Sequence, residues 1–273
     1  MTTIILLLFS INSSYFLKLS PGVMSQGLGG VSIMIDEGLS AFHNPALVQN
    51  TKVNCTLSRW LYSTNVFSMG ACFKNNSIGI SYLNYGGIQG YNEYGIPTNE
   101  FNPYNMCLIL ARKLGLFGVS IKAFGEKIDD YTLYGVCGGI SSYIDFDKIS
   151  IGAKVDNLGK EFAQNTRIPF TTALGLKFTL PRSIDIFIES KLPDLEINIG
   201  LLYKYQNIRL LLGTKYLRPQ NLIGEAELGL RLSDFDFTSG LLIEIQNYEI
   251  GYSFVYNELS NAHQFSITFT PYP

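Results

Sequence analysis

LEINIGLLYK, residues 195–204, alternates between apolar and polar side chains over most of its length. The apolar parity holds Leu195, Ile197, Ile199, Leu201 and Tyr203, and the polar parity holds Glu196, Asn198, Gly200 and Lys204. Successive side chains of a β-strand point to opposite faces of the sheet, so this stretch predicts a strand with one apolar face and one polar face.

The same alternation recurs from about Val53 to the C-terminus, in segments separated by short polar turns. Three further examples are Ile208–Leu212, Ala226–Leu232 with Glu225, Glu227 and Arg231 on its polar parity, and Phe265–Phe269. Segments of roughly ten alternating residues are the signature of a transmembrane β-barrel, and single-chain bacterial barrels have even numbers of strands. We therefore predict an all-β fold, a transmembrane antiparallel β-barrel of about 14 strands with a short N-terminal helical plug.

Alternation alone does not distinguish this barrel from a soluble β-sandwich, whose apolar faces turn inward. Low charge favours the barrel, because Asp, Glu, Lys and Arg make up 15% of the chain while apolar residues make up 47%. A charge on the lipid face would cost about 2–4 kcal/mol at the bilayer midplane, which explains why charges keep to one parity. A net charge of −2 gives no case for nucleic-acid binding.

The first residues predict export to the bacterial outer membrane. Ile4–Ile11 form an apolar block that is too short for a transmembrane helix but suits the core of a signal peptide. A buried first strand is the alternative, since no Lys or Arg precedes the block. We predict a signal peptide at 1–14, a plug segment at 15–50 and an outer-membrane β-barrel at 51–273.

The stretch QGLGGVSIMIDEGLSAFHNPAL, residues 26–47, differs from the segments on either side. Glycines allow tight bends, acidic residues favour a helix start, and Asn before Pro predicts an N-cap followed by a short helix through Leu47. An ordinary loop and helix of a soluble domain is the alternative. The residues that define this plug motif are Gly27, Gly29, Gly30, Asp36, Phe42, Asn44, Pro45 and Ala46.

Catalytic, cofactor and metal motifs are not found in the sequence. The two histidines, His43 and His263, have no metal-ligand spacing, the four cysteines form no C-x-x-C pair, and the glycines at 27–30 are not followed by G-K-[ST]. We expect structural histidines, small packing cysteines and no enzyme activity.

In the order of its motifs the chain resembles the PorV/PorQ group of outer-membrane proteins, most of all its PorQ branch, and is distantly similar to FadL-type channels. The plug motif carries the first part of the resemblance, and Asn157-Leu158-Gly159 carries the middle. A strand and long loop carry the rest, through Tyr82, Asn84, Tyr85, Gly86, Gly95, Glu100 and Phe101. The resemblance implies an outer-membrane barrel of the type IX secretion system, in contact with secretion-system proteins or secreted cargo.

Two functions follow from these observations. The first is a scaffold for protein secretion that uses the loop at Tyr85–Pro103 and the barrel rim. The second is a FadL-like passive channel for hydrophobic or small solutes, gated by the plug. A channel predicts a continuous lumen once the plug shifts, whereas a scaffold predicts a filled lumen and a lasting partner.

Overall fold

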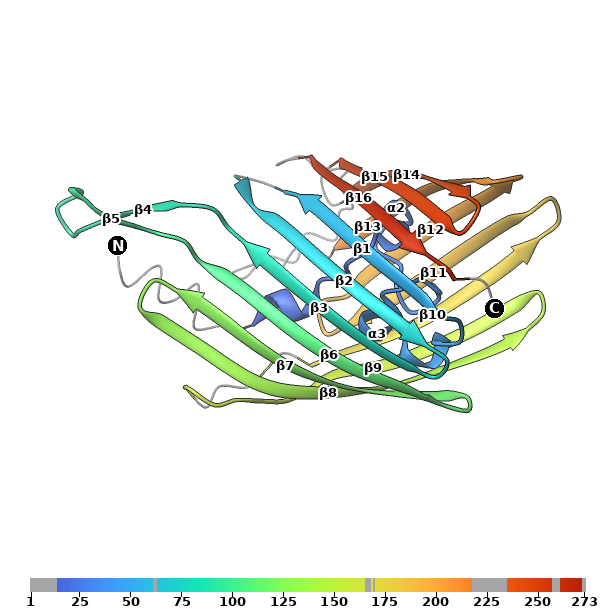
Figure 1. Cartoon of the computed structure of the whole chain (residues 1–273), viewed down its shortest axis with the longest axis horizontal. Coiled ribbons are helices and arrows are strands. Elements are labelled where there is room, and N and C mark those ends of the chain that lie inside the picture. Colours follow the sequence, from blue (N-terminus) through green and yellow to red (C-terminus); the bar gives the residue numbers. More distant parts are fainter. Residues whose placement is uncertain are drawn as a thin grey trace, which may run out of the picture.

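The computed structural model describes residues 14–60, 63–164, 168, 170–217, 235–256 and 261–271. Within them, 14 strands form one closed antiparallel barrel, in which each strand pairs with its neighbour in the sequence and β1 pairs with β16 (Figure 1). The predicted fold class and strand number are therefore confirmed. The barrel strands are β1 (Lys52–Arg59), β2 (Asn65–Phe73), β3 (Asn76–Asn84), β6 (Tyr104–Leu114), β7 (Phe117–Ile128), β8 (Tyr131–Phe146), β9 (Ile149–Glu161), β10 (Thr171–Leu180), β11 (Ile184–Leu192), β12 (Glu196–Tyr205), β13 (Ile208–Leu217), β14 (Phe235–Ile245), β15 (Tyr248–Tyr256) and β16 (Ala262–Phe269).

Alternating exposure along the strands shows which parity faces outward. On β13, Leu210 and Leu212 are 46% and 56% exposed, whereas Leu211 between them is 1% exposed. The apolar parity thus covers the outside of the barrel, where it can contact lipid, and the soluble sandwich interpretation is wrong. This closed barrel with an apolar outer face is the structure expected of a protein in the bacterial outer membrane.

The two ends of the barrel differ in their connections. Short turns join β12 to β13 and β14 to β15 at one end, while β3 and β6 are joined at the other end by residues 85–103. These residues contain a two-stranded hairpin, β4 (Ile88–Tyr91) and β5 (Pro97–Phe101), that extends beyond the barrel (Figure 1). Outer-membrane barrels have short periplasmic turns and longer extracellular loops, so the hairpin marks the extracellular end.

The sequence pattern also predicts a second long loop at Asn157–Pro169. The first part of this stretch is strand, because β9 continues to Glu161. In β9, Asp156 and Asn157 form a bulge opposite Gly139, with Asn157 at a φ of 62°. The bulge breaks the alternation, which is why the sequence pattern ended the strand too early. The strand predicted at 226–232 and the signal peptide, except for its last residue, lie outside the described residues.

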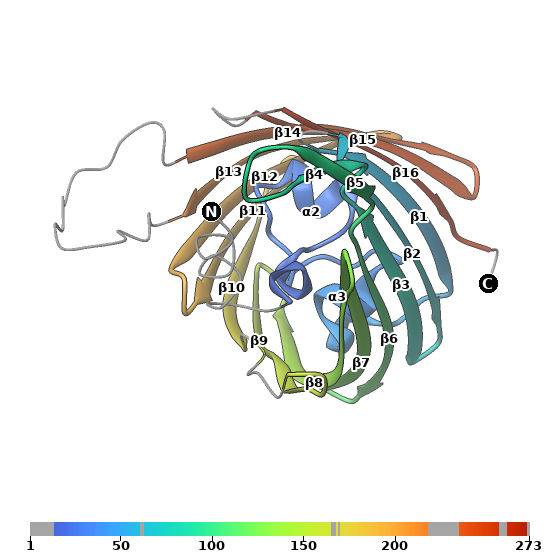
Figure 2. The same cartoon turned by 90° about the vertical axis from the view of Figure 1, so that its left-hand side faces the viewer.

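The N-terminal residues 14–50, here called the luminal segment, lie inside the ring of strands (Figure 2). They contain η1 (Tyr15–Lys18), α2 (Val23–Gly27), α3 (Ser40–His43) and η2 (Pro45–Leu47). Asn44 is the N-cap of η2 and its side chain accepts a hydrogen bond from the Ala46 N–H, as predicted. Asp36 and Glu37 lie before α3, and neither is in the first turn of a helix, contrary to our expectation. No helix among the described residues is long and apolar enough to span a membrane.

Candidate functional site: the luminal segment and its contacts

The luminal segment packs its apolar side chains against the inner wall of the barrel. Val23, Leu28 and Ile33 of the segment belong to one buried cluster. The wall contributes side chains that lie on the otherwise polar parity of their strands, namely Phe187, Leu202, Leu211 and Leu242. Burial of this apolar surface holds the segment in the lumen, at roughly 25 cal/mol per Å² removed from water.

Glycines in the wall let the backbone of the segment approach the strands closely. A Cβ placed on Gly213 of β13 would lie 2.2 Å from the Gly29 nitrogen, and one on Gly118 of β7 would lie 2.2 Å from the Ala46 nitrogen. Such distances are far below van der Waals contact, so a larger residue at either position would push the segment away.

Glu189 of β11 forms the most concentrated polar contact with the segment. Its carboxylate accepts hydrogen bonds from the Ser32 N–H at 2.8 Å, the Ser32 hydroxyl at 3.0 Å and the Ile33 N–H at 2.9 Å. Glu189 is fully buried, and Lys191 Nζ lies 3.4 Å from Glu189 Oε1. A buried carboxylate with this many donors is well compensated for its lost hydration.

Neighbouring strands add further hydrogen bonds to the glycine-rich part of the segment. Lys191 Nζ and Asn198 Nδ2 both donate to the Gly30 carbonyl, at 3.0 and 3.1 Å. Thr238 Oγ1 accepts from the Gly29 N–H and donates to the Gly27 carbonyl. The wall therefore satisfies the Gly27 and Gly30 carbonyls, while the Gly29 and Gly30 N–H groups also donate to carbonyls of α2.

Asn44 and Lys154 hold the second half of the segment. Asn44 Nδ2 donates to the Ile33 carbonyl at 2.7 Å and to the Ser142 carbonyl of β8 at 3.2 Å. Lys154 Nζ of β9 donates to the Phe42 carbonyl at 2.6 Å. The segment is thus fixed to both sides of the lumen.

A buried charge cluster lies in the wall next to the segment, at the β9 bulge. Asp156 Oδ2 is 2.7 Å from Lys122 Nζ and 2.6 Å from Lys154 Nζ. Lys122 also donates to Asn157 Oδ1, whose amide in turn donates to the Leu17 carbonyl. The bulge therefore aims two polar side chains of β9 at the segment.

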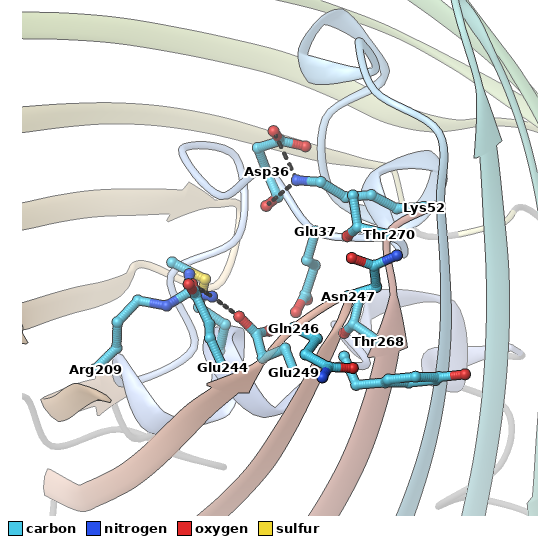
Figure 3. Close-up of a pocket in the computed structure, with 12 residues that line it drawn as sticks. Asp36, Glu37, Lys52, Arg209, Glu244, Gln246, Asn247, Glu249, Thr268 and Thr270 are labelled. Atoms are coloured by element: carbon cyan, nitrogen blue, oxygen red, sulfur yellow. Dashed lines mark hydrogen bonds and ion pairs between the residues drawn. The ribbon is translucent and has the colours of Figure 1, made fainter. Parts of the chain in front are cut away.

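A cavity of about 350 Å³ lies between the segment and the periplasmic end of the wall. Figure 3 shows Asp36 paired with Lys52 on one side and Arg209 beside Glu244 and Glu249 on the other. Glu37, Thr268, Thr270, Gln246 and Asn247 complete most of its lining. The cavity is lined mainly by polar and charged side chains, which suits a water-filled space.

Glu37 also faces a histidine within the segment. His43 Nδ1 is 3.3 Å from Glu37 Oε1, and both side chains are buried. Burial raises the pKa of Glu37 to about 8, against the opposing charge of Lys52, and burial lowers the pKa of His43 to about 3. Both groups therefore favour their neutral forms near neutral pH.

All residues of the predicted plug motif lie in the luminal segment, but they do different things. Gly29 and Gly30 form the bend held by the wall, at φ values of 73° and 86°, and Asn44 links two parts of the segment. Asp36 lines the cavity, and Phe42 packs beside the apolar clusters. Gly27, Pro45 and Ala46 provide close contacts to β13 and β7.

The predicted loop motif lies in a different part of the molecule, at the extracellular end (Figure 1). Asn84 accepts a hydrogen bond from the Gly86 N–H, and Tyr85 Oη accepts one from Asn105 Nδ2. Gly95 forms the hairpin tip with a φ of 74°. The other members are Tyr82 at the end of β3 and Glu100 and Phe101 on β5. The structure does not bring this motif together with the plug motif.

The sequence pattern does not reveal the anchoring roles of Glu189 and Lys154, nor the cluster of Lys122 and Asp156. A charged residue on the polar parity of a strand is most simply a solvated residue of the barrel interior, and the one departure from this pattern is the broken alternation at Asp156-Asn157. Among the described residues, no group of His, Cys, Asp and Glu could hold a metal ion.

Taken together, the closed barrel and the segment inside it define a class: outer-membrane β-barrels whose lumen is occupied by their own N-terminal residues. No protein-family model matches the sequence, and no curated protein matches it. Solved structures of low sequence identity do share the fold.

The toluene transporter TodX of Pseudomonas putida is 12% identical, with a TM-score of 0.63 over 93% of this chain and 99% of TodX. The monoaromatic hydrocarbon channel CymD is 11% identical, with a TM-score of 0.58 over 92% of this chain and 98% of CymD. A FadL homologue from Pseudomonas aeruginosa is 11% identical, with a TM-score of 0.57 over 92% and 99% of the two chains. TodX is named as a transporter and CymD as a channel, and all three neighbours share the fold of this chain over more than nine tenths of its length.

Proposed function

We propose that this chain is a passive outer-membrane channel for hydrophobic or small solutes, in which the luminal segment is the gate. The observation that carries the proposal is the full-length similarity of fold to TodX, CymD and the FadL homologue. In this proposal residues 15–50 act as the plug and residues 51–273 as the channel wall, while cleavage of residues 1–14 stays a prediction.

An apolar cluster near the extracellular end supports hydrophobic solutes. Leu17, Phe124 and Ile168 are buried together there, and Phe16 packs edge-on against Phe124 with ring centroids 6.3 Å apart. A shift of the segment would expose this apolar surface at the mouth of the lumen to an apolar solute, and burial of both surfaces is favourable. Monoaromatic hydrocarbons, named for two of the structural neighbours, are the first solutes to test.

The contacts of the luminal segment support its role as a gate. All four cysteines are free, so no disulfide fixes the segment to the wall. Its polar anchors, such as Glu189 to Ser32 and Lys154 to Phe42, are individual hydrogen bonds that can break and re-form. A shift of the segment would connect the apolar cluster with the polar cavity at the periplasmic end.

Uptake by intact cells tests this proposal, because lipopolysaccharide makes the outer membrane a barrier that simple liposomes lack. The chain would be expressed in a Gram-negative host, and entry of the fluorescent probe N-phenyl-1-naphthylamine followed over time. We expect faster entry than in vector controls, and competition by a monoaromatic hydrocarbon. Entry at the control rate, with heat-modifiable barrel in the membrane, would overturn the proposal for hydrophobic solutes. Swelling of proteoliposomes in solutions of small sugars then tests whether the channel passes small polar solutes.

The secretion scaffold implied by the PorV/PorQ resemblance receives no support from the comparisons and stays a prediction. Its test is co-purification of the chain with type IX secretion proteins from a bacterium that has that system. Stable association without solute uptake would favour the scaffold over the channel.

A further inference from the structure

The side chain of His43 has a fixed orientation and a fixed tautomer. Its Nε2 lies 2.5 Å from the Pro21 carbonyl oxygen, and a carbonyl can only accept a hydrogen bond. Nε2 therefore carries a proton. In the neutral ring Nδ1 then presents a lone pair, and it is this atom that faces Glu37 Oε1 at 3.3 Å.

Two lone pairs at this distance would repel each other, because both side chains are buried. His43 is 0% exposed and Glu37 is 7% exposed. Among the described residues, neither Oε1 nor Nδ1 has another hydrogen-bond partner. One proton between the two atoms turns this repulsion into a hydrogen bond, whereas no proton leaves a buried carboxylate against a lone pair.

The pair joins two distant parts of the luminal segment. Pro21 precedes α2, which packs on β13 to β16, whereas Glu37 and His43 belong to the stretch around α3, which packs on β2, β3 and β6. The Met24 backbone also hydrogen-bonds the Glu37 carboxyl. The stretch around α3 therefore contacts the α2 region twice, through His43 at Pro21 and through Glu37 at Met24. Loss of the pair would separate the half of the segment that contains α2 from the half that contains α3.

We propose that Glu37 and His43 share a single proton and that this proton keeps the luminal segment in its lumen-filling form. The segment loosens when the proton is lost and also when a second proton is added. This inference rests on the proposed function for its effect on transport, but the shared proton itself can be tested independently.

Charged groups of the wall face the carboxyl side of the pair. Lys52 of β1 and Arg209 of β13 favour an ionised Glu37, whereas Asp36 opposes it. Lys52 is held by Asp36 at 3.0 Å, and Arg209 is paired with Glu244 and Glu249 of β14 and β15. Because both cations are already neutralised by these partners, burial dominates, and the Glu37 pKa is raised to about 8.

Most influences on the imidazole disfavour its cationic form. Burial is the largest, the Pro21 carbonyl opposes it, and the charges of Lys154 of β9 and Lys191 of β11 add to it. From β2, the Cys72 thiol donates to the Gly38 carbonyl and carries no charge when protonated. Lys113 of β6 interacts electrostatically with Asp36, the neighbour of Glu37 in the sequence.

Linkage gives the pH dependence of segment opening. In the opened segment Glu37 and His43 would titrate at their ordinary pKa values, 4.5 and 6.5, against about 8 and about 3 in the closed one. The closed form holds one proton from about pH 3 to about pH 8, and the open form holds about one only near pH 5.5. Closure is therefore most favoured near pH 5.5. The open form has fewer protons above pH 6.5, so closure weakens about eightfold as pH rises from 6.5 to 8. It has more protons below pH 4.5, so closure weakens similarly toward pH 3.

Infrared spectroscopy of the full chain, combined with the uptake assay, tests the proposal. Glu37→Gln is the central variant because its amide can donate to Nδ1 at every pH. Glu93→Gln, in the exposed turn between β4 and β5, is the matched control. At pH 6 we expect a protonated-carboxyl band that E37Q removes and E93Q retains, and that fades near pH 8. Probe uptake should rise above pH 7 in wild type and E93Q but stay flat in E37Q.

The outcomes separate the two proposals. A protonated-carboxyl band that is unchanged in E37Q, or absent at pH 6, would overturn the shared proton whatever the transport result. A band that behaves as expected, with no uptake by any variant, would overturn the channel and leave the proton in place. Uptake that rises with pH equally in wild type and E37Q would overturn the link between the proton and opening. Heat-modifiable migration of each variant confirms that its barrel has folded.

Discussion

Removal of the Glu189 carboxylate should release the luminal segment more than any other single truncation in the wall. Glu189→Ala leaves the Ser32 and Ile33 N–H groups without their acceptor in a site that is fully buried. The Ser32 hydroxyl can rotate toward another acceptor, so only the two backbone donors need be counted. Lys191 keeps the Gly30 carbonyl and Glu196 as partners, at 3.0 and 2.8 Å.

The magnitude follows from those two donors. A buried donor left without a partner costs about 1–3 kcal/mol, so the closed segment should lose about 2–6 kcal/mol. At about 1.4 kcal/mol per factor of ten, the fraction of opened segment rises by at least about 30-fold and by about a thousandfold at the middle of that range. The barrel itself should persist, because Glu189 sits between paired strands whose backbone hydrogen bonds are unaffected.

Hydrogen exchange measured by mass spectrometry on peptides that cover Ser32 and Ile33 checks this prediction. Asp185→Ala is the matched control, since Asp185 lies on the same face of β11 but pairs with Lys177 and Lys204 of the wall. We expect faster exchange in the segment for E189A than for D185A, with faster probe uptake. Equal exchange in the two variants would refute the reasoning that Glu189 anchors the segment.

Three further predictions concern the wall. Gly213→Val should displace the segment and raise uptake while the barrel still shows heat-modifiable migration, because a side chain there meets the segment backbone at 2.2 Å. Asp156→Asn should lower the denaturation midpoint more than Lys122→Met does, since the first leaves two buried cations unpaired at a cost of about 3–5 kcal/mol and the second leaves one intact pair. Leu201→Lys places a charge on the lipid face of β12 and should cost about 2–4 kcal/mol in urea unfolding from lipid vesicles, less if it lies near the interface. A Leu201→Lys barrel as stable as wild type would contradict the assignment of the outer face.

The alternation of side chains was enough to predict the barrel. The outer face must be apolar because it contacts lipid, and the charged and polar side chains must therefore lie on the inner face. The strand at 195–204 illustrates this, since its odd-numbered residues face outward in β12 as predicted. The hairpin at 88–101 was missed because its residues are polar and glycine-rich, and a short two-stranded sheet leaves no burial pattern.

The contents of the lumen were harder to predict than its wall. Leu202, Leu211 and Leu242 interrupt the polar parity and pack on the segment, but one apolar residue in a polar row has no unique meaning in a sequence. The anchors depend on pairs far apart in the chain, such as Glu189 with Ser32. Only the register of the closed barrel brings such residues together.

A reversible cross-link between the segment and the wall tests the gate most directly. A Cβ built on Gly175 of β10 lies 3.0 Å from Met34 Cγ, the position that a cysteine sulfur would take. A disulfide needs about this separation between one sulfur and the partner's Cβ, so Met34→Cys with Gly175→Cys should form one when the native cysteines are replaced. We predict that oxidation lowers probe uptake by cells to the vector level and that reduction restores it. Uptake that is the same in the oxidised and reduced states, with the cross-link confirmed by mass spectrometry, would contradict a channel gated by the luminal segment.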